Sequence, residues 1–510
     1  MRKLSHGSAI ALLIWLLAVN VYRAATQSLT HDEALTWLFY LAGSPGNIFA
    51  IGEPNNHLLA TLLMRLSTTL LGNSELAIRL TSLVAGALYF YVIYALALSV
   101  FGEGLLFFLT VALLSLNPLM LDFLVAARGY GPAVAFYFLA LYVLLRYRTS
   151  RRYDFRLLYV AGISLSCAVM ANMSLFSPAL VTAAVFCATL SVPEVSSKAR
   201  QKRGQGRPAP YPSMAQERIR FLLPVVFLAA LFLAVNPVKA SALGSVYRLP
   251  GGFVDSIFSL IVSSMSHNQG LAGLNRETAF MRIWQQALAF CILPAVVIVS
   301  LWLSLRCKRT DASGLLLLWA SSTIAGSMLL HVVAARLWNL PYPADRTGLV
   351  YIPLTLLTVV TLAKVLRVQH GRMHLGWIPM LGLAVSLTVQ YAIQFQWNHF
   401  YCWIYDADNK AFLEKIRTDR TSAGGPLHVG VSWQLAPSLE YYRLAKHLEW
   451  LAPVTRQGPE GEYDYYLLLE QDRIWVERKG LKVMYEGPVS RTILAKPGRD
   501  LLQGGRTQVS

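Results

Sequence analysis

The chain has 510 residues, of which 55% are hydrophobic and only 14% are charged, and its mean hydropathy is +0.46. Soluble globular proteins carry about 25% charged residues, so this composition excludes an ordinary soluble protein and indicates an integral membrane protein. The formal net charge of +18 does not indicate nucleic-acid binding, because the basic residues lie between apolar runs, where they orient a membrane protein.

Apolar runs recur along most of the chain. A spanning helix needs about 20 mostly apolar residues. The first run follows Arg2 and Lys3 and resembles a signal peptide, but further runs follow, so we expect it to remain as the first span. About eleven spans are expected, over residues 8–24, 78–100, 104–121, 130–147, 157–172, 175–192, 220–236, 284–305, 313–335, 347–366 and 375–395.

The connections between these runs predict the orientation in the membrane. Basic residues gather after the fourth, sixth, eighth and tenth runs, within 146–156, 198–220, 306–309 and 364–372. The positive-inside rule places these connections and the N-terminus in the cytoplasm. An odd number of spans then places the C-terminus outside. Since no organelle signal is seen, we expect a bacterial inner (cell) membrane.

The connections on the other side are different. Two are long, 25–77 and 237–283, and a short one holds RLWNLPYPADR. After Trp397 the chain becomes polar, which predicts a small extracytoplasmic α/β domain. Its helices are expected over DNKAFLEKIRTD and PSLEYYRLAKHL, and its strands over PLHVGVSW, YDYYLLLE, IWVERKG and LKVMYEG. The chain thus divides into a transmembrane domain over 1–400 and an α/β domain over 401–510.

The first long connection begins with LTHDEALTWLFY, residues 29–40. Thr30 and Glu33 have the spacing of a capping box, in which each residue satisfies a backbone amide of the other. The apolar residues that follow predict an amphipathic helix on the membrane surface. In this capping box the Glu33 side chain bonds to the Thr30 amide, whereas the Asp32 side chain remains free. The helix dipole favours the ionised form of Asp32.

Further polar residues gather in the expected outer connections. Charges at membrane level are expensive and usually face a cavity or a partner, so these residues could form one polar cavity. They are His31, Asn55, Asn56, His57, Glu75, Arg79, Asp122, Arg128, Tyr130, Tyr342, Asp345 and Arg346.

Each of these residues also has a simpler interpretation. The arginines could extend to lipid head groups. Asn55 and Asn56 suit a turn after Pro54. His57 could be an interfacial hydrogen-bonding residue, and Asp122 and Tyr130 could serve packing alone.

Four motifs, in this order and with this span pattern, resemble a known family. They are HDEA at 31–34, EPNNHLL at 53–59, GNSELAIRL at 72–80 and ARGYGPAVAFYFLALYVLLR at 127–146. The arrangement resembles the GT-C glycosyltransferases, and among them family 39 and its relatives, which include protein O-mannosyltransferases and lipid A aminoarabinose transferases. The resemblance covers about 1–400 and is strongest over 30–150.

This resemblance implies an inverting transfer of a sugar from a polyprenyl-phosphate donor to a lipid, glycan or protein acceptor on the outer face. Asp32 is the expected general base in the first outer connection, and Glu33 would position a substrate. Arg346, and after it Arg128, would hold the donor phosphate. The other expected substrate-binding residues are His31, Asn55, Asn56, His57, Arg79, Tyr130 and Tyr342.

Elementary chemistry agrees with these roles. A hydroxyl that attacks an anomeric carbon needs a base within hydrogen-bonding reach. Phosphate is already a good leaving group, so positive charge helps more than a second acid. No cofactor is implied, and the five cysteines form no metal-ligand spacing. A divalent metal is left open.

Two other functions are compatible with a polytopic membrane protein. The first is a transporter or flippase of lipid-linked glycans, although inverted repeats and broken helices are not evident in the sequence. The second is a non-catalytic membrane assembly protein whose outer domain binds a partner.

Overall fold

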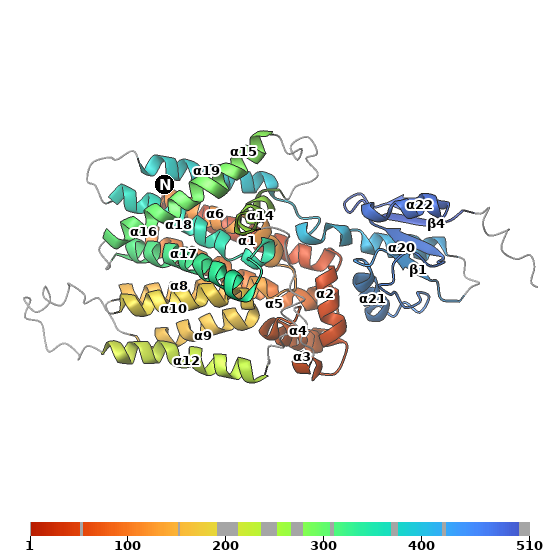
Figure 1. Cartoon of the computed structure of the whole chain (residues 1–510), viewed down its shortest axis with the longest axis horizontal. Helices are drawn as coiled ribbons and strands as arrows, with labels where there is room; N and C mark the ends of the chain where they lie inside the picture. The colour runs from red at the N-terminus through yellow and green to blue at the C-terminus, as the bar shows by residue number, and fades with distance from the viewer. Residues whose placement is uncertain are drawn as a thin grey trace, which may run out of the picture.

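The computed structural model describes residues 2–50, 55–150, 154–190, 213–235, 252–266, 279–306, 311–368, 376–420 and 425–498. Figure 1 shows a bundle of long helices followed, along the longest axis, by a smaller part that contains the strands. The chain is therefore a polytopic α-helical membrane protein with a small C-terminal α/β part. The Glu53-Pro54 start of one motif and the basic residues 198–207 lie outside the described residues.

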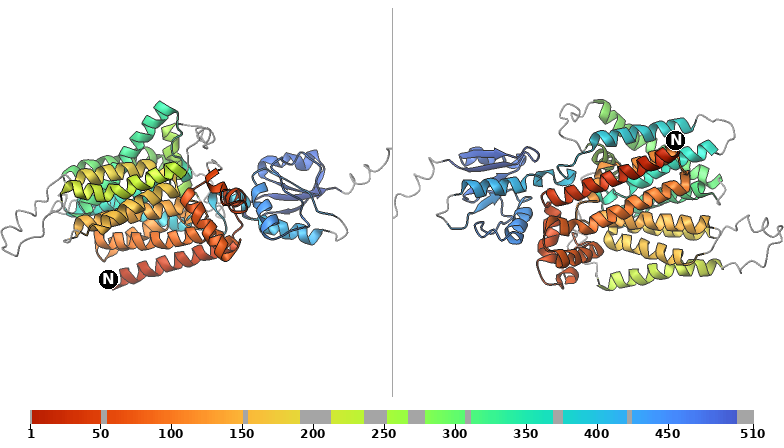
Figure 2. Two further views of the ribbon diagram at one scale, coloured as in Figure 1. Left: turned by 90° about the horizontal axis from the view of Figure 1, so that it is seen from below. Right: turned by 180° about the vertical axis from the view of Figure 1, so that it is seen from behind.

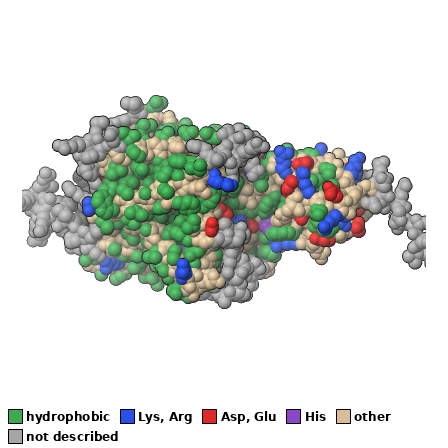
Figure 3. Space-filling view, turned by 45° about the horizontal axis from the view of Figure 1, so that its top comes forward, with side chains coloured by type: hydrophobic (Ala, Val, Ile, Leu, Met, Phe, Trp, Pro, Cys, Tyr) green, Lys and Arg blue, Asp and Glu red, His purple; other side chains and the backbone are tan. Residues whose placement is uncertain are grey.

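A helix coincides with each expected span. These helices are α1 (Arg2–Thr26), α5 (Glu75–Phe101), α6 (Leu105–Ser115), α8 (Tyr130–Thr149), α9 (Arg156–Ala171), α10 (Phe176–Thr189), α12 (Met214–Val235), α15 (Ala279–Ala287) with η3 (Leu288–Ile292) and α16 (Leu293–Arg306), α17 (Ala312–Trp338), α18 (Tyr351–Val368) and α19 (Trp377–Gln394). Within the described part of the chain, six helices are long and apolar enough to cross a membrane. Figure 3 shows the hydrophobic side chains that cover the visible face of this bundle, while charged side chains gather on the C-terminal part.

The third expected span, 104–121, is wrong at its end. Helix α6 ends at Ser115, and a separate helix α7 (Pro118–Phe123) follows. Asn117 caps α7 by accepting a hydrogen bond from the Met120 amide at 3.0 Å, and Pro118 occupies the first turn. Both features start a new helix rather than continue an old one.

The first long connection folds into short helices at the end of the bundle that faces the C-terminal part. They are α2 (His31–Thr36), the π-helix η1 (Trp37–Leu41), α3 (Asn47–Ala50) and α4 (Leu58–Leu71). The expectation that this segment lies on the membrane surface is wrong. Trp37 is buried, and its ring contacts the ring of Tyr441 in the C-terminal part, with centroids 5.1 Å apart. The apolar face of this segment packs on protein instead of lipid.

The second long connection contains a helix that sequence reasoning missed, α14 (Phe253–Met265). It packs beside the 3₁₀ turn η4 (Asp345–Gly348), which precedes α18. Ser256 donates a hydrogen bond to the Pro343 carbonyl, and the Asp345 amide donates to Ser259 Oγ at 3.2 Å. Helix α14 and the turn therefore form one unit.

The C-terminal part holds a four-stranded sheet in the order β1-β2-β4-β3, with β1 and β2 parallel and the other pairs antiparallel. Its strands are β1 (Val429–Val431), β2 (Tyr465–Leu468), β3 (Leu481–Glu486) and β4 (Ile493–Pro497), and its helices include α20 (Asn409–Asp419), α21 (Ala436–Ala445) and α22 (Ile474–Arg478). Figure 2 shows this part at one end of the molecule and the N-terminus at the other.

One expected strand in this part is wrong and one strand was missed. IWVERKG forms helix α22, and the fourth strand is β4 instead. Short apolar runs cannot be assigned to helix or strand by their pattern alone. Trp475 and Val476 of α22 pack on the buried side chains of β2 and β4, so tertiary packing decides the conformation.

Candidate active site

The start of α2 is built by the expected capping box. Thr30 Oγ1 accepts a hydrogen bond from the Glu33 amide at 3.4 Å, and the Thr30 amide donates to Glu33 Oε2 at 2.9 Å. This reciprocal pair fixes the first turn, and Asp32 lies within that turn. The capping box is confirmed.

Glu33 has further partners that its sequence spacing does not show. Arg79 Nε and Nη2 donate to its carboxylate at 2.9 and 2.7 Å, and the Ala127 amide donates at 2.6 Å. The other Arg79 hydrogens reach the carbonyls of Ala24, Gln27 and Ser28. Glu33 and Arg79 are fully buried, so Arg79 does not extend to lipid head groups. All five of its N–H donors are used within the protein, and the pair fastens α2 to α5.

Asp32 lies between two arginines that are distant in sequence. Arg346 Nη1 is 2.5 Å from Asp32 Oδ2, and Arg128 Nη2 is 3.7 Å from the same oxygen. Burial by itself would raise the pKa of the Asp32 carboxyl, but Arg128 and Arg346 outweigh burial and lower the pKa to about 2. Asp32 is therefore an anion at neutral pH.

Arg128 is held in place by the same connection. Its guanidinium donates to Asn55 Oδ1 at 2.6 Å, to Thr36 Oγ1 at 3.2 Å and to the Asp32 carbonyl at 3.4 Å. Asn55 also donates to that carbonyl at 3.4 Å. The expected candidates Asp32, Asn55 and Arg128 thus lie together.

His57 and Tyr130 lie beside this group. Their rings meet edge to face with centroids 5.3 Å apart. Burial, followed by the positive charge of Arg128 and Arg346, lowers the pKa of His57 well below its usual value, so its ring is neutral. Its buried Nε2 has no hydrogen-bond partner among the described residues.

Arg346 sits on the turn η4, and its environment includes residues that sequence reasoning missed. Its guanidinium lies 5.6 Å from the ring centroid of Trp403, which is itself buried against Phe123. Burial, followed by the negative charges of Asp406 and Asp32, raises the pKa of Tyr405. The aromatic run after the last span, Tyr401–Asp406, was the available signal.

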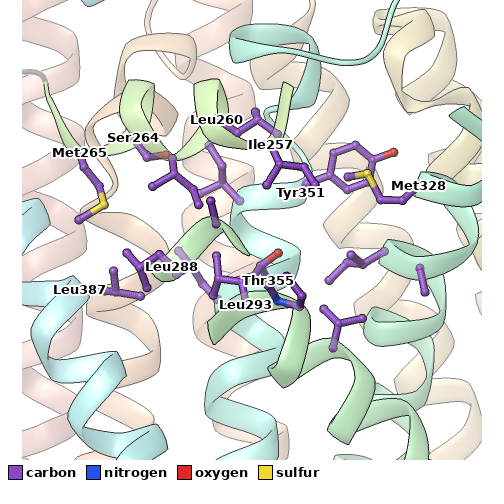
Figure 4. Close-up of a pocket in the computed structure, with 18 of the residues that line it drawn as sticks. Ile257, Leu260, Ser264, Met265, Leu288, Leu293, Met328, Tyr351, Thr355 and Leu387 are labelled. Atoms are coloured by element: carbon purple, nitrogen blue, oxygen red, sulfur yellow. The ribbon is translucent and has the colours of Figure 1, made fainter. Parts of the chain in front are cut away.

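An apolar cavity of about 310 Å³ opens beside the turn that carries Arg346. Figure 4 shows its walls, which come from α14, η3, α16, α17, α18 and α19. Leu260 of α14 lines the cavity and also contacts Gly348 of η4 so closely that a Cβ there would lie 2.5 Å from Leu260 Cδ2. The cavity wall and the Arg346 turn are thus in direct contact.

The remaining candidates lie elsewhere. Tyr342 packs on Phe253, with ring centroids 5.6 Å apart, and Asn56 donates to the Ile48 carbonyl at 2.7 Å. Asp122 forms a buried ion pair with Arg23 at 2.5 Å.

His31 and Glu75 both meet the C-terminal part of the chain. His31 Nδ1 lies 2.5 Å from the Gln434 carbonyl. Glu75 pairs with Lys410 at 2.9 Å. These contacts join the bundle to the C-terminal part.

No group of three or more His, Cys, Asp or Glu side chains is placed to hold a metal ion in the described ranges.

Residues 55–199 match the family model described as dolichyl-phosphate-mannose-protein mannosyltransferase. The match confirms the resemblance to membrane glycosyltransferases of the protein O-mannosyltransferase type. The matched segment contains Arg79, Arg128 and Tyr130 but not Asp32 or Arg346. No curated protein matches the sequence.

Solved structures that are similar to the chain include three that represent two proteins. ArnT from Cupriavidus metallidurans in the apo state has 12% identity and a TM-score of 0.45, over 97% of this chain and 99% of that one. The same enzyme bound to undecaprenyl phosphate has 14% identity and a TM-score of 0.43, over 96% and 98%. The oligosaccharyltransferase of Archaeoglobus fulgidus, in complex with zinc and sulfate, has 14% identity and a TM-score of 0.39, over 96% and 73%.

Proposed function

We propose that the protein is a membrane glycosyltransferase that moves a sugar from a polyprenyl-phosphate donor to an acceptor hydroxyl, with Asp32 as the general base. One observation carries the proposal: an ionised, nearly buried carboxylate lies between Arg346 and Arg128, and the turn that carries Arg346 contacts the wall of an apolar cavity in the helical bundle. The family match over 55–199, whose description names a dolichyl-phosphate sugar, supports the donor class.

The cavity suits the lipid part of such a donor. It is lined almost entirely by apolar side chains, so it would accept an isoprenoid chain and reject a charged group. Arg346 lies on the turn that touches the cavity wall, and its side chain is partly exposed. A phosphate held by Arg346 would therefore place the sugar beside Asp32.

The arginines would also assist the departure of the phosphate. The acceptor oxygen forms a bond to the anomeric carbon, and the bond from that carbon to the phosphate oxygen breaks with its electron pair. The acceptor proton passes to Asp32. Arg346 and Arg128 stabilise the negative charge that develops on the phosphate. Attack from the face opposite the phosphate inverts the anomeric centre.

The ion pair between Asp32 and Arg346 would make donor binding precede proton transfer to Asp32. A carboxylate with a pKa of about 2 is a weak base while Arg346 is bound to it. The phosphate of the donor would compete for Arg346 and draw its charge away from Asp32. The basicity of Asp32 then rises only when the donor is in place, which limits unproductive proton transfer.

The same arrangement gives Glu33 a structural role. Its carboxylate already accepts hydrogen bonds from Thr30, Arg79 and Ala127. Glu33 would therefore hold α2 in place and not contact the substrate. Among the other expected binding residues, Asn55 would orient Arg128, and His57 and Tyr130 would line the sugar site.

The charge distribution supports an active site on the extracytoplasmic face. Helices α8, α16 and α18 have basic residues in their last turns, at the end of the bundle away from the C-terminal part. With the positive-inside rule, the N-terminus would be cytoplasmic, and the site and the C-terminal part would face outward, in a bacterial inner membrane.

The proposal is tested with the purified full-length protein in lipid nanodiscs. Polyprenyl-phosphate sugars are supplied together with lipid, glycan and peptide acceptors, and release of polyprenyl phosphate is measured for the wild type, for Asp32→Asn and for Glu414→Gln as an exposed control. We expect release by the wild type and the control only. Equal release by Asp32→Asn would refute the role of Asp32 as base. The same protein is also reconstituted into vesicles, where movement of intact donor across the membrane without any release would favour a flippase.

A further inference from the structure

The C-terminal part of the chain contributes a cluster of side chains next to the proposed base. The indole of Trp433 lies edge to face with the imidazole of His31, with ring centroids 5.7 Å apart. The guanidinium of Arg456 lies 5.7 Å from the centroid of Trp433, and its Nη2 is 2.9 Å from His31 Nε2. His31 directly precedes Asp32, and each influences the pKa of the other.

Trp433 is half exposed although it sits on a firmly held turn. The turn joins β1 to α21. On one side of Trp433, Ser432 is fully buried, donates to Asp472 at 2.5 Å and accepts from the Leu469 amide at 2.9 Å. On the other side, Leu435 is fully buried. An exposed indole on a fixed turn is a preformed surface for a ligand.

The hydrogen bonds of His31 define its role in this cluster. A guanidinium only donates, so His31 Nε2 accepts from Arg456 and His31 Nδ1 donates to the Gln434 carbonyl at 2.5 Å. Burial lowers the pKa of His31, so the ring is neutral. His31 thus acts as a positioning residue that joins the turn at 433–434 to the helix that carries Asp32.

The chemistry of the cluster is suited to a sugar ring. An exposed indole offers a flat face to the C–H groups of a pyranose. The amide oxygen of Gln434 is buried and has no hydrogen-bond partner in the described part of the chain, so it can accept from a hydroxyl. The nearby edge strand β1 is buried along its whole length and offers no free edge to an extended peptide.

We propose that the acceptor is a carbohydrate, free or lipid-linked, and that Trp433, Gln434 and Arg456 form the subsite that binds its ring. That the bound carbohydrate is the acceptor rests on the proposed function, whereas the binding of a carbohydrate to this subsite does not. The ring would stack on Trp433, with His31 between the ring and Asp32. A hydroxyl of the bound sugar, or of the next sugar unit, would then reach Asp32.

Binding is tested without donor, so that it is separate from catalysis. Saturation-transfer NMR is recorded on the full-length protein in nanodiscs with methyl pyranosides at millimolar concentration, and in parallel with a peptide rich in serine and threonine. The variants are Trp433→Ala, Trp433→Phe and Trp475→Ala. Trp475 is the matched control, because it carries an arginine, Arg478, 5.4 Å from its ring on the same part of the chain. Since Trp475 also packs on β2 and β4, its variant controls for a loss of folded protein, which thermal unfolding of every variant measures.

We expect pyranosides to bind the wild type through their ring C–H groups. Trp433→Ala should weaken binding about tenfold or more. Trp433→Phe should retain most of the binding, and Trp475→Ala should match the wild type. Equal binding by Trp433→Ala and Trp475→Ala, absence of pyranoside binding to the wild type, or selective binding of the peptide would overturn the proposal.

The Asp32→Asn variant distinguishes this proposal from the proposed function. It should bind pyranosides as the wild type does while releasing no polyprenyl phosphate. If Asp32→Asn releases polyprenyl phosphate normally while Trp433→Ala still loses pyranoside binding, the assigned base is wrong and the carbohydrate site stands.

Discussion

The guanidinium of Arg346 lies 2.5 Å from the carboxylate of Asp32, although 314 positions separate the two residues in the sequence. This contact joins the start of α2 to the turn before α18. It places a positive charge that could hold a phosphate next to a carboxylate that could accept a proton.

Replacing Asp32 with Asn should abolish transfer and leave the fold intact. The amide keeps the size of the side chain but cannot accept the acceptor proton, so we expect kcat to fall about 10²–10⁴-fold. Thermal unfolding in detergent should change little. Asp122→Asn is the contrasting variant, because its buried ion pair with Arg23 predicts a loss of stability before any specific loss of chemistry.

Removal of Arg346 should alter both donor binding and the pH profile. In the wild type, burial by itself would raise the pKa of Asp32, but Arg128 and Arg346 lower the pKa to about 2. Asp32 is thus unprotonated above that pH, and activity should not decline in mild acid through this group. In Arg346→Ala the pKa rises, so the acid limb of kcat/KM should move to higher pH.

Donor KM should also rise in Arg346→Ala, by about tenfold or more for a lost charge-assisted contact. Arg336→Ala removes an exposed arginine in the last turn of α17 and serves as the control. An unchanged donor KM together with an unchanged acid limb would remove Arg346 from the phosphate role.

Glu33 should matter for stability more than for proton transfer. Glu33→Ala leaves Arg79 buried without its carboxylate, and breaking a buried pair in this way costs about 3–5 kcal/mol. The midpoint of thermal unfolding should fall clearly. Glu414→Ala breaks an exposed pair with Arg417 and should leave the midpoint nearly unchanged. A stable Glu33→Ala protein would contradict the structural role.

Filling the apolar cavity should discriminate between donors by lipid length. Ala325 lines the cavity, whereas Leu329 lies on the same helix and is exposed. Ala325→Trp should raise the KM of a long-chain donor more than that of a short-chain analogue, because the indole occupies part of the space for the tail. Leu329→Trp should affect neither donor. Equal effects of Ala325→Trp on both donors would place the tail elsewhere.

A methyl group at Gly129 should displace residues of the candidate active site. A Cβ there would lie 1.9 Å from the Ala171 carbonyl oxygen and 2.7 Å from His57 Cβ. Gly129→Ala must therefore displace Arg128 or His57, and we expect lower activity and a lower unfolding midpoint. Gly382→Ala in α19 meets nothing within 4 Å and should behave as the wild type. Wild-type activity of Gly129→Ala would show that the turn can relax without harm.

The helical elements and the capping box could be predicted because their causes are local. A run of apolar residues long enough to cross a bilayer favours a helix wherever it occurs. Thr30 and Glu33 satisfy each other within one turn. Short apolar segments such as Ile474–Arg478 could not be assigned in this way, because packing on β2 and β4 decides their conformation.

The partners of the polar residues depend on contacts between distant segments. Composition and hydropathy predicted a helical membrane chain with a polar first connection, and Asp32, Arg128 and Arg346 were among a larger set of polar candidates. Only the tertiary structure brought Asp32 to Arg346, buried Arg79 against Glu33 and set His31 against Arg456. Hydrogen bonds within a turn are fixed by spacing, whereas pairings across the chain are fixed by how the helices and the sheet pack.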